Sequence, residues 1–297
     1  MENRNSLKNK NHYYQTRSAP YKAKIKELLK NEDAILVECR GDPSTAAVKL
    51  YALAERMINI SSNYLVLNGI GEAIFNNRDE AALGEAKKFY SKSLIYLENI
   101  VTGKVDAPFS EYEEALSELK SIPIPQRYDI VKKLGLTCSL LQTAYGDNTK
   151  WRWVFVDMEG ICATVSKNLL DLKRVQTNTD PSSPDYEPLF YHLYFVKKML
   201  INSADRFYSR YSLIAKRRDD MQKAMNFLSA LGRICAVINE KDELEEIKKK
   251  LEHWQNILDN DARKIMPPAA AEAQTSLLGG GGDWTPLRMK KADTWKK

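Results

Sequence analysis

The fold is decided by residues 188–238, which read PLFYHLYFVKKMLINSADRFYSRYSLIAKRRDDMQKAMNFLSALGRICAVI. No proline follows Pro188 in this stretch, and its only glycine is Gly232. Apolar and aromatic residues recur every three or four positions, first over 189–214 and then over 221–238. This spacing is typical of amphipathic helices rather than strands.

A single helix over these residues would be about 75 Å long, longer than a compact bundle needs. We therefore expect a bend near Lys216–Asp220, and Asn239 ends the pattern. Beyond it, residues 244–258 carry apolar side chains in alternating steps of three and four, the seam of a coiled coil. Since this seam is only two heptads long, we expect it to pack within the domain.

Helical patterns also fill the chain upstream of this stretch. They cover 45–74, 83–101, 109–119, 126–145 and 151–176. The short Asn- and Asp-containing turn between the first two patterns predicts an antiparallel hairpin. We predict an all-α protein, an antiparallel long-helix bundle of about seven helices with flexible N- and C-terminal tails.

The composition divides the chain into four segments. We expect a basic flexible arm, a helical domain, a linker rich in Pro, Ala and Gly, and a basic tail peptide that contains Trp. Their predicted bounds are 1–19, 20–265, 266–282 and 283–297. The helical domain has two possible halves, which are 20–121 and 126–265.

The basic charge lies at the two ends of the chain. Residues 1–30 carry a net charge of +6 and residues 283–297 carry +3, whereas residues 31–282 carry −3. A dedicated nucleic-acid domain concentrates Lys and Arg on one folded face. In this chain we expect any affinity for anions to reside in the two ends. A simpler interpretation of the same charge is that it keeps the ends soluble.

No segment is long and apolar enough to cross a membrane. The longest stretch without a charged residue is Met57–Gly71, and it contains several Asn and Ser side chains. A membrane-spanning helix needs about 18–20 mostly apolar residues. The polar N-terminus shows no signal peptide. We therefore predict a cytoplasmic protein.

The cysteines and histidines predict neither a metal site nor a cofactor. Cys39, Cys138, Cys162 and Cys235 are far apart, without C-x-x-C spacing, and are interpreted as buried thiols. The Glu-x-x-His and H-E-x-x-H patterns are absent, as are the P-loop and the Gly-x-Ser-x-Gly elbow. We predict no catalytic, cofactor-binding or metal-binding residues. An enzyme with a pocket between helices is the less favoured alternative.

Aromatic residues are concentrated between Tyr186 and Tyr211. Pairs at i and i+4 on adjacent faces make the apolar stripe wider than one helix contact requires. Two interpretations are open: a helix buried on several sides, or a surface for a partner, because Tyr and Arg are enriched at interface hot spots. The candidates for this secondary partner surface are Tyr191, Tyr194, Tyr208, Tyr211, Arg206 and Arg210.

The C-terminal peptide has an unusual composition for a solubilising tail. Residues 283–297 read DWTPLRMKKADTWKK and follow four glycines. Large apolar side chains among basic ones, behind a flexible spacer, are typical of a tethered recognition peptide. The candidate partner-binding residues are Trp284, Leu287, Arg288, Met289, Lys290, Lys291 and Trp295. The same peptide could instead touch an anionic membrane surface or fold back onto its own bundle.

These features favour a non-catalytic scaffold or adaptor that joins a larger assembly through its helix faces and its C-terminal peptide. A protein partner is therefore expected. The alternative is binding of nucleic acid or an anionic membrane surface through the basic tails, which steep salt dependence would reveal. The sequence leaves the partner's identity and the oligomeric state open.

Overall fold

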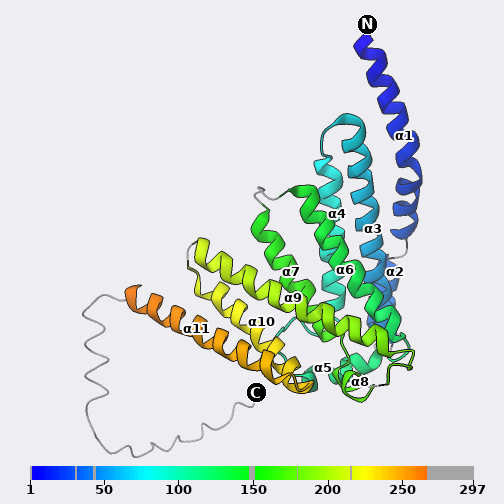
Figure 1. The fold of residues 1–297 in the computed structure, drawn as a ribbon. Coiled ribbons are helices and arrows are strands. Elements are labelled where there is room, and N and C mark those ends of the chain that lie inside the picture. Colours follow the sequence, from blue (N-terminus) through cyan, green and yellow to red (C-terminus); the bar gives the residue numbers. More distant parts are fainter. Residues whose placement is uncertain are drawn as a thin grey trace, which may run out of the picture. The chain divides into compact units, whose positions relative to one another are not determined.

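The structure is a computed structural model. It describes residues 2–30, 32–42, 45–146, 151–178, 180–214 and 216–265 of the chain. Every regular element in these ranges is an α-helix, so the all-α prediction is confirmed (Figure 1). In chain order the helices are α1 (Glu2–Leu28), α2 (Glu32–Gly41), α3 (Ala46–Phe75), α4 (Glu80–Glu98), α5 (Phe109–Glu118), α6 (Ile124–Tyr145), α7 (Arg152–Asn168), α8 (Leu172–Thr177), α9 (Tyr186–Leu213), α10 (Arg218–Val237) and α11 (Lys241–Ile265).

The chain forms two compact units, residues 1–251 and 252–297, and α11 crosses their junction. A continuous apolar core in the first unit reaches from Ile25 to Leu169. Residues before and after 121–126 belong to this one core. The core is therefore shared by the two possible halves, 20–121 and 126–265.

The N-terminal arm over 1–19 was expected to be flexible, but from Glu2 onward it is helical. It forms the first part of α1, which ends at Leu28. Residues 1–30 contain no glycine, and Pro20 is accommodated inside the helix at the loss of one backbone hydrogen bond. Helix α1 packs along α3, and Ser18 and Ile25 are buried. Packing on a neighbour rather than strong amphipathicity therefore stabilises this helix.

Helices α3 and α4 form the predicted hairpin. Asn76 ends α3 in the left-handed conformation with φ of 55°, which asparagine tolerates better than most residues. The side chain of Asp79 then accepts a hydrogen bond from the Ala82 amide and caps α4. Between the helices, the Ser61 hydroxyl donates to the Ala86 carbonyl over 2.8 Å.

The single helix predicted over 151–176 is divided into α7 and α8, and α1 and α2 precede the first predicted helix. The described chain therefore has more helices than the roughly seven expected. The division falls where Asp171 caps α8 by accepting from the Arg174 amide. Just before it, every residue from Cys162 to Leu170 is buried, so this end of α7 is covered on all sides.

Polar residues at the buried end of α7 hold the loop between α4 and α5. The Lys167 ammonium donates to the Ala107 carbonyl over 2.7 Å, and the Asn168 amide donates to the Thr102 carbonyl over 2.8 Å. Burial, and to a smaller extent the charge of Arg233, lower the pKa of Lys167 to about 8. These contacts satisfy groups that would otherwise destabilise the core.

The predicted bend near Lys216–Asp220 is confirmed, since α9 ends at Leu213 and α10 begins at Arg218. Lys216 has φ of 48° at this break. After α10, the predicted apolar seam falls on α11, and its first residues, Leu244 and Ile247, approach Gly232 of α10. Among the described helices, none has the length and apolar character needed to span a membrane.

We expect the stability of the fold to fall in acid because of His192. Its Nε2 lies 2.9 Å from the Ser166 carbonyl oxygen and joins α9 to α7. Burial lowers its pKa from 6.5 to about 4, and the nearby Arg127 charge acts in the same direction, against the hydrogen bond to Ser166. The unfolded state therefore binds a proton between these pH values that the folded state excludes.

Lowering the pH from 6.5 to 4 should reduce the free energy of unfolding of the wild type by about 2–3 kcal/mol more than that of His192→Gln. Urea denaturation across this pH range measures it, and the exposed His12→Gln serves as the control variant. Parallel curves for the wild type and His192→Gln would contradict the assignment.

Candidate functional site

Helix α9 has two faces of different character. Its buried face packs against α6, α7 and α10. The buried positions are Leu189, His192, Val196, Leu200, Ser203, Ala204, Phe207, Arg210 and Tyr211. On the opposite face Phe190, Tyr191 and Tyr194 have exposed fractions of 52%, 45% and 55%. A cluster of large aromatic side chains in water is unusual and marks a candidate contact surface.

These exposed rings belong to a group that we call the aromatic face, made of Tyr128, Tyr186, Phe190, Tyr191 and Tyr194, in which ring contacts link the first four. Along α9, the Tyr186 and Phe190 rings stack at 6.3 Å, and Phe190 meets Tyr191 edge-on at 5.7 Å. Tyr191 in turn stacks on Tyr128 of α6 at 6.4 Å. These four linked rings hold one another in place, so they lose little conformational freedom when a partner binds.

Two hollows accompany the aromatic face along the line where α6 and α9 meet. The first, of about 400 Å³, lies beside Tyr128 and Tyr191. Its lining residues are Pro125, Tyr128, Asp129, Lys132, Glu187, Pro188 and Tyr191. The two helices approach closely at Gly135, where a Cβ atom would lie 2.5 Å from the Phe195 ring. The second hollow begins there and extends along the two helices.

The second hollow has about 230 Å³, less than the 300–1,000 Å³ common for small-molecule sites. Cys138 lies in its wall, and burial raises the pKa of this thiol to about 11, which opposes formation of a reactive thiolate. Glu159, also in the wall, has its pKa raised by burial, although Gln142 and Arg206 hydrogen-bond its carboxylate.

Charge around the aromatic face is nearly balanced. The Lys132 ammonium lies 4.7 Å from the centre of the Tyr128 ring and also pairs with Asp129 at 2.7 Å. Lys198 lies 5.6 Å from the Tyr194 ring, and Glu187 lines the first hollow. The face therefore lacks the strong positive excess that a nucleic-acid backbone requires.

The structure divides the predicted secondary partner surface. Tyr191 and Tyr194 are exposed, as a partner surface requires, and Tyr208 is half-buried. Tyr211 and Arg210 are buried, with exposed fractions of 2% and 9%, because α7 and α10 cover that side of α9. These two residues therefore belong to the core and not to a contact surface.

Arg206, the remaining member of that prediction, is also turned toward its own protein. It is half-buried, and its guanidinium donates to the Gln142 side-chain oxygen over 3.0 Å and to the Glu159 carboxylate. It thus joins α9 to α6 and α7. Its charge is neutralised within the fold, so a partner would have to displace these bonds to use it.

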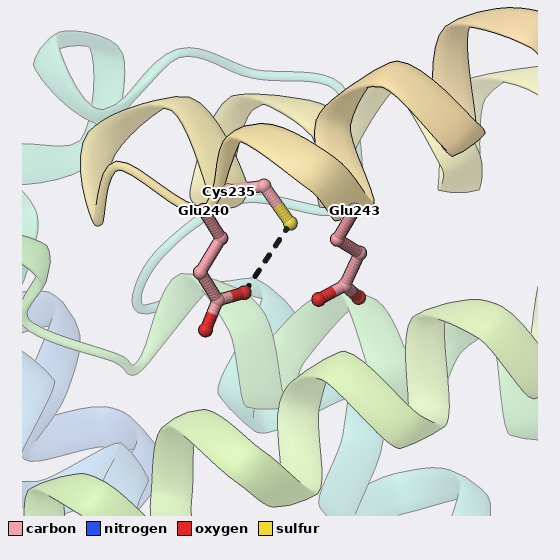
Figure 2. A group of neighbouring side chains, drawn as sticks. All are labelled: Cys235, Glu240 and Glu243. Carbon is pink, nitrogen blue, oxygen red and sulfur yellow. Dashed lines mark hydrogen bonds between the residues drawn. The ribbon is translucent and has the colours of Figure 1, made fainter.

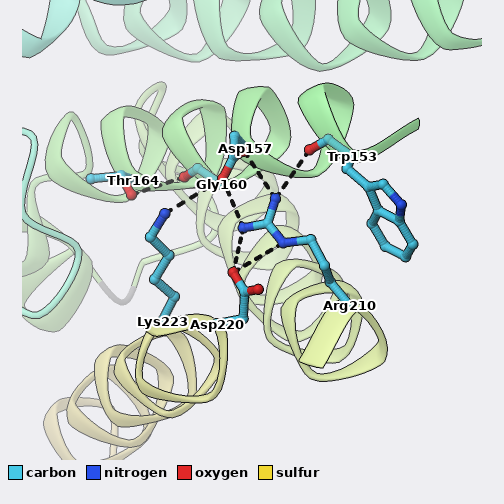
Figure 3. A network of polar contacts seen from close by, with 7 residues as sticks. All are labelled: Trp153, Asp157, Gly160, Thr164, Arg210, Asp220 and Lys223. Atoms are coloured by element: carbon cyan, nitrogen blue, oxygen red, sulfur yellow. Dashed lines mark hydrogen bonds and ion pairs between the residues drawn. The ribbon is translucent and has the colours of Figure 1, made fainter. Parts of the chain in front are cut away.

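Arg210 is the centre of an ion network that joins α7, α9 and α10 (Figure 3). Its guanidinium donates to both Asp157 oxygens over 2.9 and 3.0 Å and to Asp220 over 2.6 Å. It also donates to the Trp153 carbonyl. Burial alone would lower the pKa of Arg210, but the two carboxylates raise it. Lys223 adds a longer contact of 3.5 Å to Asp157.

Every partner in this network is satisfied within the fold, so we interpret it as structural. Asp157 shows the balance: burial alone would raise its pKa, but Arg210 and Lys223 lower it below its ordinary value. A carboxylate held ionised by a bidentate guanidinium is a poor general base, because its proton affinity is reduced.

A second cluster brings together Cys235, Glu240 and Glu243, whose potential ligand atoms lie within 4.8 Å of one another (Figure 2). The Lys197 ammonium pairs with both carboxylates, at 2.6 Å from Glu243. Burial raises the pKa of Cys235 to about 11. A bound cation would compete with this ammonium, so we assign the cluster to the packing of α9 against the α10–α11 turn.

The predicted C-terminal contact residues, Trp284 to Trp295, lie outside the described residues. Tyr128, a member of the aromatic face, is not among the residues predicted from the sequence. A signal for it was present, because Tyr128, Leu136 and Leu140 share one line of α6 at multiples of four residues. Leu136 and Leu140 have exposed fractions of 62% and 46%.

We expect Arg210→Met to lower the free energy of unfolding by about 3–5 kcal/mol, because it leaves Asp220, which is 4% exposed, charged and unpaired in the core. Lys223→Met removes only an exposed contact to the same network and should change it by less than about 1 kcal/mol. Chemical denaturation of both variants measures the difference. Equal, small losses would contradict a structural role for the network.

Comparison with known proteins gives a family but no relative of known activity. The model of the TP0443 family matches residues 10–262, which include nearly all the described helices. No curated protein and no solved structure matches the chain. The family's name specifies neither an activity nor a ligand. Because the match covers most of its length, the chain belongs to the TP0443 family.

Proposed function

We propose that this protein is a non-catalytic adaptor that binds a protein partner through the aromatic face. One observation carries the proposal: Phe190, Tyr191 and Tyr194 are about half exposed on one helix, and the Phe190 and Tyr191 rings contact each other. Rigid aromatic side chains supply large contact area at low entropic cost, and they dominate protein interfaces. The adjacent hollow beside Tyr128 can accept a side chain of the partner.

The chemistry of this face favours a protein over the alternatives. Stacking of single-stranded nucleic acid needs a positive groove beside the rings, but Lys132 is paired with Asp129, and Glu187 lies in the same hollow. Insertion into a membrane surface needs basic residues around an apolar helix face. The balanced charge supports neither, whereas protein interfaces have an aromatic centre and a mixed polar rim.

The C-terminal peptide 283–297 is the second contact element of this proposal. It carries Trp284, Leu287 and Trp295 among basic residues, behind four glycines. Two contact elements in one chain raise the apparent affinity for a partner that can engage both, because binding of the first fixes the local concentration of the second.

An enzyme is the less supported function. In the second hollow the Glu159 carboxylate accepts hydrogen bonds from Gln142 and Arg206, and in the first hollow Asp129 is paired with Lys132. A catalytic acid or base has to be free to exchange its proton with substrate. A small molecule that raises the melting temperature of the full chain would favour the enzyme instead.

Photo-cross-linking tests the adaptor proposal. We expect a benzophenone amino acid in place of Tyr194 to give one discrete adduct with a protein when the full chain is irradiated in an extract of its source cells. The matched control carries the same group at Val37 of α2, which is 64% exposed but distant in sequence from the aromatic face. That position should give no such adduct.

Adding Tyr191→Ala to the Tyr194 variant should reduce the adduct at least about tenfold, the effect of losing one moderate hot spot of about 1.4 kcal/mol or more. A truncation at Gly279 that keeps the adduct places the main contact on the helical body, and one that loses it places the main contact on the tail. Equal adducts at positions 194 and 37, or an adduct with nucleic acid, would contradict the proposal.

A further inference from the structure

Helix α1 lies at the edge of the first unit, along α3 (Figure 1). One narrow stripe of α1 faces α3. Within it Ser18 and Ile25 are buried, Tyr21 and Leu28 are half-buried, and Tyr14 packs on Phe75 with 5.6 Å between ring centres. The rest of the described α1 surface is exposed.

The exposed surface of α1 carries basic residues along both of its flanks. At 3.6 residues per turn, one flank holds Lys8, Lys22 and Lys26, and the other holds Lys10, Arg17 and Lys24. All six side chains are exposed.

The ridge between the flanks carries Asn9, His12 and Thr16 and, five turns after Asn9, the carboxylate of Glu27, and these side chains are exposed as well. Amide, imidazole and hydroxyl groups on such a ridge can donate and accept hydrogen bonds. The helix therefore shows solvent a polar ridge bordered by two basic lines.

This charge is barely neutralised by the protein. Lys24 pairs with Glu27 at 3.0 Å, and Arg17 lies against the Tyr13 ring. Within the described residues, Lys8, Lys10 and Lys26 have no acidic group in ion-pair distance. Since residues 31–282 carry a net charge of −3, the net positive charge of the chain comes from residues 1–30 and from its C-terminal end.

We propose that α1 binds duplex DNA, lying in the major groove with its two basic flanks against the phosphates of the two strands. An α-helix of about 10–12 Å diameter fits a groove about 12 Å wide. The ridge with Asn9 and Thr16 then faces the base edges.

The same geometry argues against other polyanions. The major groove of duplex RNA is too narrow and deep for a helix. A membrane surface needs an apolar stripe free to enter the lipid, but the apolar stripe of α1, with Ile25, is already packed on α3. This binding surface is separate from the aromatic face, so either proposal can fail alone.

The test is the salt dependence of binding between the full chain and a mixed-sequence DNA duplex of about two helical turns. The dissociation constant of the wild type should rise on the order of a thousandfold between about 50 and 200 mM salt, the effect of roughly six phosphate contacts. The combined variant Lys8→Gln, Lys22→Gln, Lys26→Gln should reduce the log–log salt slope by about 3.

The matched control is Lys120→Gln, Lys241→Gln, Lys249→Gln, which removes the same charge from exposed positions outside α1. It should leave the salt slope within about 1 of the wild type. Glutamine preserves helix propensity, and circular dichroism verifies that both variants fold. Equal slope changes in the two variants, no duplex binding at about 50 mM salt, or tighter binding to duplex RNA or anionic vesicles would overturn the proposal.

Discussion

Two polar contacts to α7 fix how α9 is turned about its own axis, and the exposed surface of the bundle depends on them. Near one end His192 meets the Ser166 carbonyl, and near the other Arg210 binds the Trp153 carbonyl and Asp157. The pairs run in opposite order along the two helices, so α9 lies antiparallel to α7. With both ends held, rotation of α9 would leave a buried polar group without a partner, which costs more than a lost surface contact.

The aromatic face follows from this orientation. Positions 192 and 210 lie on the side of α9 that faces α7, so Phe190, Tyr191 and Tyr194 are turned outward. The protein then has two exposed surfaces of opposite character on different helices: a nearly neutral aromatic one on α6 and α9, and a basic polar one on α1. An adaptor needs separate surfaces of this kind, because one partner can occupy each without competing for the same residues.

The sequence predicts local features better than the side on which a helix is covered. The α3–α4 hairpin and the break at Lys216 were predictable, because caps, turns and apolar period lie within a few residues. The role of Arg210 was not, since Asp157 and Asp220 come from other helices and nothing near Arg210 in the sequence identifies them. Helix α1 was missed for a related reason: it is stabilised by packing on α3 and shows little apolar periodicity of its own.

The central claim, that α9 is held with its aromatic residues outward, can be tested by hydroxyl-radical footprinting of the free full-length chain with detection by mass spectrometry. Tyrosines of one helix are compared with each other, so intrinsic reactivity cancels. The account predicts rapid oxidation of Tyr191 and Tyr194 and strong protection of Tyr211, which is 2% exposed. Oxidation of Tyr211 as fast as Tyr194 would contradict this orientation of α9 and the function built on it.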